Sequence, residues 1–170
     1  MKPSTTPIPP GFHTVTASLT VSNAAEAIEF YKKALGAEER MRMTGPDGKI
    51  GHAELKIGDS IIFLNDEMSG APGCPRSPLS LGGSTGSVYL YVEDVDKSHE
   101  RAVNAGGKSN MPVMDMFWGD RFGGFTDPFG HQWAIATHTR DLSPEEIEEG
   151  AKAFWAEMAQ MAQMAQKKSA

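Results

Sequence analysis

Apolar residues near the start of the chain switch from a strand-like to a helix-like spacing. Residues 14–21 alternate and are rich in β-branched side chains, which is typical of a strand. Asn23 offers a helix N-cap with Glu26 three positions further on, and Gly36 offers a left-handed stop. These signals predict a helix over residues 24–35. Its apolar positions have helical spacing: Ala24, Ala27, Ile28, Tyr31, Ala34 and Leu35.

Short strands and a long loop complete the first half of the chain. The pattern predicts strands at 39–43, 49–57 and 60–65, with turns at 45–48 and 58–59. Residues 66–86 are rich in Gly, Pro and Ser and predict a long loop, and long ordered loops often lie over a functional opening. The first half therefore has the order strand, helix and three strands.

The second half repeats this order. Val21 precedes Val92 by 71 positions, and Gly36 precedes Gly107 by the same number. The repeat predicts a strand at 87–92, a helix at 95–105 and strands near 108–116, 120–126 and 131–137. A repeat of this length is half a domain rather than a solenoid unit. Duplicated halves usually build one pseudo-symmetric body, and we expect a cavity where they meet.

A further helix begins near residue 143 and has no counterpart in the repeat. Ser143 is an N-cap, Pro144 suits the first turn and Glu146 completes a capping box. An apolar stripe follows: Ala151, Phe154, Trp155, Met158, Met161, Ala162 and Ala165. We expect this stripe to pack on its own subunit or on a dimer mate. A Met-rich docking face for another protein is the alternative.

Composition narrows the class of protein. A chain of 170 residues suits one domain, and 39% hydrophobic and 22% charged residues are ordinary for a soluble globular protein. The net charge of −6 argues against nucleic acid as a partner. Cys74 is the only cysteine, so no internal disulfide can form. No apolar stretch is long enough to span a bilayer, and we expect a cytoplasmic protein that does not bind membranes.

Two segments resemble a known family. The helix Ala-Ile-Glu-Phe-Tyr-Lys-Lys-Ala-Leu-Gly at 27–36 and the turn Asp-Pro-Phe-Gly at 127–130 are similar to those of the glyoxalase/bleomycin-resistance/dioxygenase superfamily, which has the vicinal oxygen chelate fold. The segments 52–55 and 117–123 are most similar to its PhnB-like branch. The likeness covers residues 12–140.

This resemblance implies an α+β fold of two βαβββ modules, at 12–66 and 86–138. Together the modules would form an eight-stranded open cup within a single domain. Residues 141–170 would form a C-terminal amphipathic helix outside that domain. The resemblance also implies a homodimer.

Metal enzymes of this family hold a divalent ion with four side chains from the first and last strand of each module. The corresponding positions here are Thr16, Ile62, Ser87 and Ala134. Two of these side chains have no donor atom, and a neutral hydroxyl is a weak ligand for Zn²⁺, Ni²⁺ or Fe²⁺. We therefore predict no metal at the usual site and no cofactor, with these four positions lining a ligand pocket.

Other side chains remain candidates for chemistry. His52 and Glu54 alternate on one strand and share a face. If that face is the cup, they are candidates for a base with an orienting acid, or for a displaced metal site; if it points outward, they are a solvated pair. Trp118 offers a flat wall and Arg121 a fork for a carboxylate or phosphate, unless Asp120 neutralises Arg121.

Three functions follow from these patterns. The first is a metal-free dimeric cup that binds a small aromatic or anionic molecule, with Tyr89 facing the cup. The second is an enzyme of the lyase, isomerase or dioxygenase type that uses His52 and Glu54. The third is a partner-binding module that uses the C-terminal helix. The sequence leaves open whether the protein is an enzyme.

Overall fold

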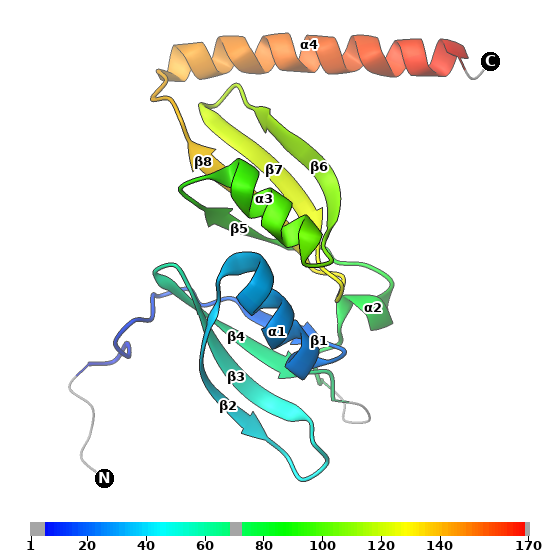
Figure 1. Cartoon of the computed structure of the whole chain (residues 1–170). Coiled ribbons are helices and arrows are strands. Elements are labelled where there is room, and N and C mark those ends of the chain that lie inside the picture. Colours follow the sequence, from blue (N-terminus) through cyan, green and yellow to red (C-terminus); the bar gives the residue numbers. More distant parts are fainter. Residues whose placement is uncertain (1–5, 69–72, 169–170) are drawn as a thin grey trace.

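A computed structural model describes residues 6–68 and 73–168, and it shows the duplicated halves as two separate four-stranded sheets (Figure 1). The first sheet has the order β1-β4-β3-β2, with β1 parallel to β4 and the other pairs antiparallel. Its elements are β1 (Ser18–Val21), α1 (Ala24–Leu35), β2 (Glu38–Thr44), β3 (Ile50–Ile57) and β4 (Ser60–Asp66).

The second sheet repeats this topology with the order β5-β8-β7-β6. Ser18 pairs with Phe63 in the first sheet, and Tyr89 pairs with Ala134 in the second, so both partners are shifted by the same 71 positions. The elements are β5 (Ser87–Tyr91), α3 (Val95–Asn104), β6 (Lys108–Asp115), β7 (Asp120–Thr126) and β8 (Gln132–His138). The α+β glyoxalase-like fold is confirmed, with two sheets that do not close into a barrel.

Local signals set the helix ends where the sequence predicts them. The side chain of Asn23 accepts the amide of Glu26, and Gly36 ends α1 with a left-handed φ of 67°. The strand predicted from residue 14 begins only at Ser18. Part of the predicted loop is the short helix α2 (Pro78–Leu81), and residues 69–72 of that loop lie outside the described residues.

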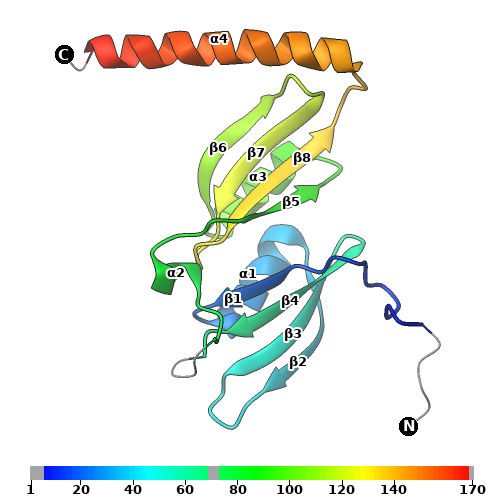
Figure 2. The same ribbon diagram turned by 180° about the vertical axis from the view of Figure 1, so that it is seen from behind.

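The two helices α1 and α3 pack against each other and against one face of each sheet. Figures 1 and 2 show both helices on the same side of the molecule and a helix-free face of each sheet on the other side. The core lies under the helices and includes Ile28, Leu55, Ile62, Trp133 and Ile135.

A buried carboxylate connects the halves within this core. Tyr31 on α1 donates its hydroxyl to Oδ2 of Asp127 at 2.7 Å, and Trp133 on β8 donates Nε1 to the same oxygen at 2.9 Å. Burial, together with the charge of Asp127, raises the pKa of the Tyr31 phenol well above its usual range. The Tyr31 phenol therefore stays protonated at every ordinary pH. Its hydrogen bond to Asp127 connects the first half of the chain to the second.

The C-terminal helix α4 (Pro144–Lys168) lies apart from this body. Its start is the predicted capping box, in which Glu146 accepts the amide of Ser143 at 2.7 Å and Ser143 accepts the amide of Glu146 at 3.2 Å. Its N-terminal turns lie against the second half, where the ring of Phe154 is 5.5 Å from that of Phe117. Figures 1 and 2 show the C-terminal part of α4 projecting beyond the sheet. None of the helices in 6–68 and 73–168 has the length and apolarity to cross a membrane.

Candidate functional site

The carboxylate of Asp120, at the start of β7, forms hydrogen bonds with four side chains on the helix-free face of the second sheet. Its Oδ2 accepts Tyr91 Oη at 3.0 Å, Trp118 Nε1 at 3.1 Å and Tyr89 Oη at 3.4 Å. Its Oδ1 faces Nδ1 of His138 at 2.7 Å. Asp120 is only 2% exposed, so this polar cluster is the buried floor of a more open surface.

Charge in this cluster is fixed by the partners of the carboxylate. Burial acts to raise the pKa of Asp120, but hydrogen bonds from His138, Tyr91 and Trp118 outweigh it and lower that pKa. The Asp120 hydrogen bond, with a second one to Asp141 at 3.1 Å, raises the pKa of His138. The ring of His138 therefore lies between two carboxylates, and both favour its charged form.

Aromatic rings form the wall around this floor. Tyr89 and Phe122 are stacked with centroids 5.6 Å apart, and Trp118 meets Phe122 edge-on at 5.8 Å. Tyr89 is 43% and Tyr91 67% exposed, a high value for side chains of this size. Burial and the nearby charges of Tyr91 and Asp120 raise the pKa of Tyr89, so its phenol remains protonated. The surface presents flat rings and neutral hydroxyls.

A tight turn holds Trp118 and Asp120 in place. Gly119 has a φ of 96°, and its carbonyl accepts the amides of Thr139 and Arg140 at 3.0 and 2.9 Å. A Cβ at this glycine would lie 2.2 Å from the Arg140 carbonyl oxygen, so only glycine fits. The turn before β7 is thus fastened to the chain after β8, which brings Asp120 opposite its register partner His138.

His52 and Glu54 lie on the helix-free face of the first sheet, because their neighbours Ala53 and Leu55 face the core. Nε2 of His52 is 3.8 Å from Oε1 of Glu54, and a guanidinium nitrogen of Arg40 is 3.4 Å from Oε2 of Glu54. The His52 ring meets Phe63 with centroids 4.9 Å apart. Of the two orientations that the sequence left open, the structure shows the open face.

A cavity of about 510 Å³ lies next to this pair, between the first sheet and the N-terminal arm. Glu54, Phe63 and Thr16 line it together with Phe12, whose ring packs 5.6 Å from that of Phe63. Thr16, predicted to line a pocket, therefore does border a cavity, although it precedes β1 rather than belonging to it.

Two predicted site residues, Ile62 and Arg121, face the helix side of their sheets instead of the open side. Ile62 is 4% exposed and belongs to the core under α1. Ile62 was assigned one position away from the true equivalent of Ala134, because β3 and β4 join through two residues, 58–59, whereas β7 and β8 join through five, 127–131. Phe63, one position later, is the residue on the open face.

Arg121 also lies on the helix side of its sheet rather than in the cup. Its Nε and Nη2 bind the carboxylate of Asp96 on α3, at 2.7 and 2.8 Å, and Nη1 reaches Asp115 at 3.3 Å. The guanidinium therefore lies on the helix side of the sheet with its charge already paired, so the expected fork for an anionic ligand is absent from the cup. The alternative in which Asp120 neutralises Arg121 is not observed, because Asp120 pairs with His138.

The remaining predicted residues converge. Ser87 is exposed, and it alternates with Tyr89 on β5, while Ala134 pairs with Tyr89 across the ladder. Together with Trp118 they share the open face of the second sheet. The central residues Asp120, His138 and Tyr91 were missed as site residues. The β7–β8 hairpin register pairs Asp120 with His138, and that pairing was the available signal.

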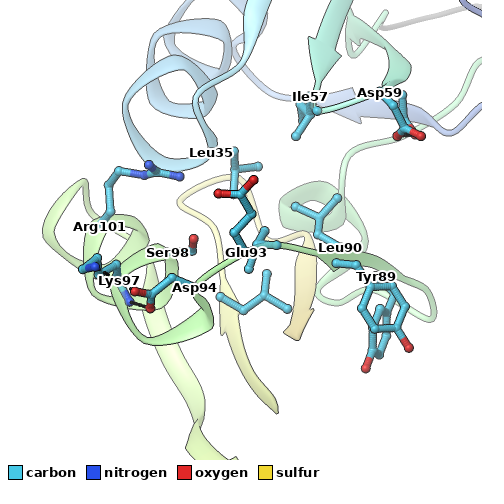
Figure 3. A pocket seen from close by; sticks show the side chains of 15 residues that line it. Leu35, Ile57, Asp59, Tyr89, Leu90, Glu93, Asp94, Lys97, Ser98 and Arg101 are labelled. Atoms are coloured by element: carbon cyan, nitrogen blue, oxygen red, sulfur yellow. Dashed lines mark hydrogen bonds and ion pairs between the residues drawn. The ribbon is translucent and has the colours of Figure 1, made fainter. Parts of the chain in front are cut away.

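A larger groove of about 930 Å³ lies between the halves on the helix side (Figure 3). Asp94, Lys97 and Arg101 of the α3 region line one side, and Ile57 and Asp59 of the β3–β4 hairpin line the other. The charged groups on the α3 side are engaged. Lys97 pairs with Asp94 at 2.9 Å, and Arg101 donates to the Ala34 carbonyl at 2.8 Å. Glu93 lines this groove as well, together with Tyr89 and Tyr91 of β5.

The structure also allows a test of the family's metal site. Three of the positions given by the strand register, Thr16, Ser87 and Ala134, carry hydroxyl or methyl groups, and the fourth carries the ring of Phe63. Across residues 6–68 and 73–168, no three His, Cys, Asp or Glu side chains gather closely enough to hold an ion. These residues do not fit the family's divalent cation.

Two βαβββ modules, each with one sheet face covered by its helix and the other open, define the vicinal oxygen chelate fold. The chain belongs to the Glyoxalase/Bleomycin resistance protein/Dioxygenase superfamily, whose family model matches residues 11–135. It is 43% identical to the Mycobacterium tuberculosis protein Rv0887c over 131 residues, which are 76% of this chain and 77% of that one.

Solved structures agree with this membership. The Pseudomonas aeruginosa protein PA1353 is 28% identical and has a TM-score of 0.58, over 75% of this chain and 99% of that one. A PhnB protein from Bacillus cereus (17% identity, TM-score 0.55, 74% and 99% covered) shares the fold. So does TnmS3, an antibiotic binding protein from Streptomyces sp. CB03234 (23% identity, TM-score 0.57, 75% and 96% covered).

Proposed function

We propose that this protein binds a small planar aromatic molecule on the Asp120 surface, in a cup completed by a second copy of the chain and without a metal at the family's usual position. The observation that carries this proposal is the Asp120 cluster. A buried carboxylate there orients two exposed tyrosines and a tryptophan on a sheet face that no helix covers.

The chemistry of the surface favours a flat ligand that carries hydrogen-bond donors. Tyr89, Phe122 and Trp118 offer ring faces and edges for stacking. Both tyrosine hydroxyls donate to Asp120, so their oxygen lone pairs face outward as acceptors. Because Arg121 is paired on the other side of the sheet, an anionic ligand loses the support that the sequence suggested. Hydroxylated or amino-substituted polycyclic molecules match best.

Exposed apolar side chains on both open faces support the dimer. Met41 and Met43 on the first sheet are 40% and 55% exposed, in addition to the tyrosines of the second. Exposed patches of this kind commonly mark interfaces. A two-fold dimer that sets the first sheet of one copy over the second sheet of the other would enclose two equal sites.

Fold likeness gives this proposal general support. TnmS3 is described as an antibiotic binding protein, and its identity of 23% speaks for the shared fold alone. The fold can therefore hold a small organic molecule.

Binding of 9-aminoacridine, a planar fluorescent amine, tests the site. We expect saturable quenching of its fluorescence, weakened at least tenfold by Trp118→Ala and by Tyr89→Ala. Lys97→Ala, an exposed change on the helix side, serves as the control and should leave affinity unchanged. Equal affinity in all variants, or no saturable binding, would reject the Asp120 surface as the site.

Complementation tests the shared cup. Met43→Glu damages only the first-sheet face and Trp118→Ala only the second, so each variant alone should fail to bind. In an equal mixture, half of the dimers are mixed and each has one intact site of two, so about a quarter of the sites should recover. No recovery after joint refolding would mean that each chain binds alone or not at all.

An acid–base enzyme that uses His52 and Glu54 is the second candidate. The 3.8 Å separation of these groups and the adjacent cavity of about 510 Å³ favour it. His52 would act as base and Glu54 would orient it. A metal at this place would need a third ligand from elsewhere, and Glu54 already faces Arg40. One transition ion per chain after purification without chelators, lost in His52→Ala, would favour a metal enzyme at this pair instead of acid–base chemistry.

A further inference from the structure

The charge of the Asp120 surface depends on one imidazole. Asp120 contacts four side chains in the described parts of the chain, and among these only His138 can carry a positive charge. The other three, Tyr89, Tyr91 and Trp118, are neutral donors. A carboxylate that is almost fully buried requires partners of both kinds to hold its charge. With the proton on the ring the cluster is neutral, and without it the charge of Asp120 is uncompensated.

The two arginines that flank this pair in the sequence are directed elsewhere. Arg121 is paired on the helix side of the sheet. The guanidinium of Arg140 donates to the Met116 carbonyl at 3.4 Å. His138 therefore supplies the positive charge that is in direct contact with Asp120, at 2.7 Å.

The remaining neighbours of the ring keep their own charge across the neutral range. The hydrogen bond to Asp120, followed by the one to the fully exposed Asp141, raises the pKa of His138. Burial raises the pKa of Tyr89, and the hydrogen bond to Asp120 raises that of Tyr91. Both phenols therefore stay protonated, and both carboxylates stay ionised. Among the groups in contact here, the His138 ring is the one that titrates between pH 5.5 and 8.5.

A ligand on this surface would lie within electrostatic range of Asp120. The exposed hydroxyls of Tyr89 and Tyr91 lie 3.4 and 3.0 Å from its Oδ2. A ligand group that donates to one of these hydroxyls is two hydrogen bonds away from the carboxylate, about 6 Å. At this distance the attraction between unit charges at a partly exposed site exceeds thermal energy, and moderate salt screens it only in part.

We propose that His138 is the residue through which the Asp120 surface selects its ligands by charge. With the imidazolium in place the surface is neutral and gives an aromatic cation no advantage over an uncharged ring of the same shape. With the neutral imidazole, the uncompensated carboxylate favours an aromatic cation such as a protonated arylamine. This inference rests on the proposed function, because it assumes that planar molecules bind here, and it adds the charge of the ligand to that function.

Two planar tricyclic probes of different charge test this selection by equilibrium dialysis. Between pH 5.5 and 8.5, 9-aminoacridine stays a cation and phenazine stays neutral. We expect wild type to bind 9-aminoacridine about fivefold more tightly at pH 8.5 than at pH 5.5, and phenazine equally at both. His138→Gln keeps a donor for Asp120 and should bind 9-aminoacridine at both pH values as tightly as wild type does at pH 8.5. His99→Gln makes the same change on the helix side of the sheet and should keep the wild-type trend.

Thermal unfolding at both pH values confirms that each variant is folded. The proposal is overturned if wild type binds 9-aminoacridine with the same affinity at both pH values, if phenazine shows the same trend, or if His138→Gln retains it. Loss of the trend in His52→Gln instead would assign the effect to the histidine that a second copy brings over this surface, and would also overturn the proposal. If neither probe binds saturably at either pH, the proposed function itself fails and this inference falls with it.

Discussion

Asp66 and Thr137 occupy equivalent positions in the two halves and perform the same task with different chemistry. Asp66 Oδ1 accepts the amide of Ala24 at 2.7 Å, and Thr137 Oγ1 accepts the amide of Val95 at 2.9 Å. Each of these amides begins the helix of its own half. The carboxylate also accepts the amide of Ile50 at 2.7 Å, whereas the hydroxyl donates to the Val92 carbonyl at 2.9 Å.

This relationship predicts unequal costs for removing the two side chains. Asp66→Ala leaves two buried amides without an acceptor, and we expect the free energy of unfolding to fall by about 3 kcal/mol. Thr137→Val keeps the shape and removes a neutral hydroxyl from two part-buried hydrogen bonds, for a smaller loss of about 1 kcal/mol. Urea unfolding at pH 7 measures both. Equal losses would contradict the assignment of the Asp66 carboxylate to both α1 and β3.

The turn at Gly119 predicts a large effect of a single methyl group. Gly119→Ala combines a positive φ with a Cβ set 2.2 Å from a carbonyl oxygen, and we expect a loss of about 3 kcal/mol in unfolding free energy. Gly83→Ala is the matched control, because nothing lies within 4 Å of its Cβ position. Thermal unfolding compares them. A Gly119→Ala protein as stable as the control would show that the turn is not fastened to Arg140.

The Asp120–His138 pair predicts a stability that declines as pH rises. The pKa of His138 is raised in the folded protein, so its contribution is fully present below the ordinary value near 6.5 and is lost as pH rises through the higher folded value. The difference in unfolding free energy between wild type and His138→Gln should therefore shrink from pH 6 to pH 9. Asp141→Asn should keep most of this pH dependence, because Asp120 is the stronger partner. A difference that grows with pH would contradict the assignment.

The hydrogen bonds of Glu39 predict a contribution to stability that is lost as pH falls. Hydrogen bonds from Arg42 and Lys32 lower the pKa of Glu39 to about 2, against an ordinary value near 4.5. A depressed carboxyl contributes stability above its unfolded pKa and loses it as pH falls through the folded one. The advantage of wild type over Glu39→Gln should be constant from pH 7 to about 5 and then decline toward pH 3. Urea midpoints across this range measure it, and a constant difference down to pH 3 would count against the ion pair.

Features set by neighbouring residues were predictable from the sequence. The caps at Asn23 and Ser143 act within one turn of their helices, so their residue types were sufficient to place both helix starts. The 71-residue repeat gave the order of the elements in both halves, and the family resemblance gave their arrangement in two βαβββ modules. The sequence did not decide which face His52 and Glu54 occupy. Alternation shows that two side chains share a face and does not show which face it is.

Features set by distant partners were not predictable. Ile62 was assigned to the wrong face because the two equivalent hairpins have turns of different length. Arg121 was expected in the cup because nothing near it in the sequence shows that it is paired. Its partner Asp96 lies 25 positions earlier, on another element. The role of Asp120 depends on β5, β8 and a turn that meet only in the folded chain.

The carboxylate of Asp127 makes the duplicated halves dependent on each other. It accepts hydrogen bonds from Tyr31 of the first half and from Trp133 of the second half, within an apolar interior. A chain divided between the halves would yield one fragment with an orphaned phenol and another with an incompletely solvated carboxylate. Neither βαβββ unit is therefore expected to be an autonomous folding unit, although each has a complete sheet and helix. The two halves are therefore expected to unfold together in one cooperative transition.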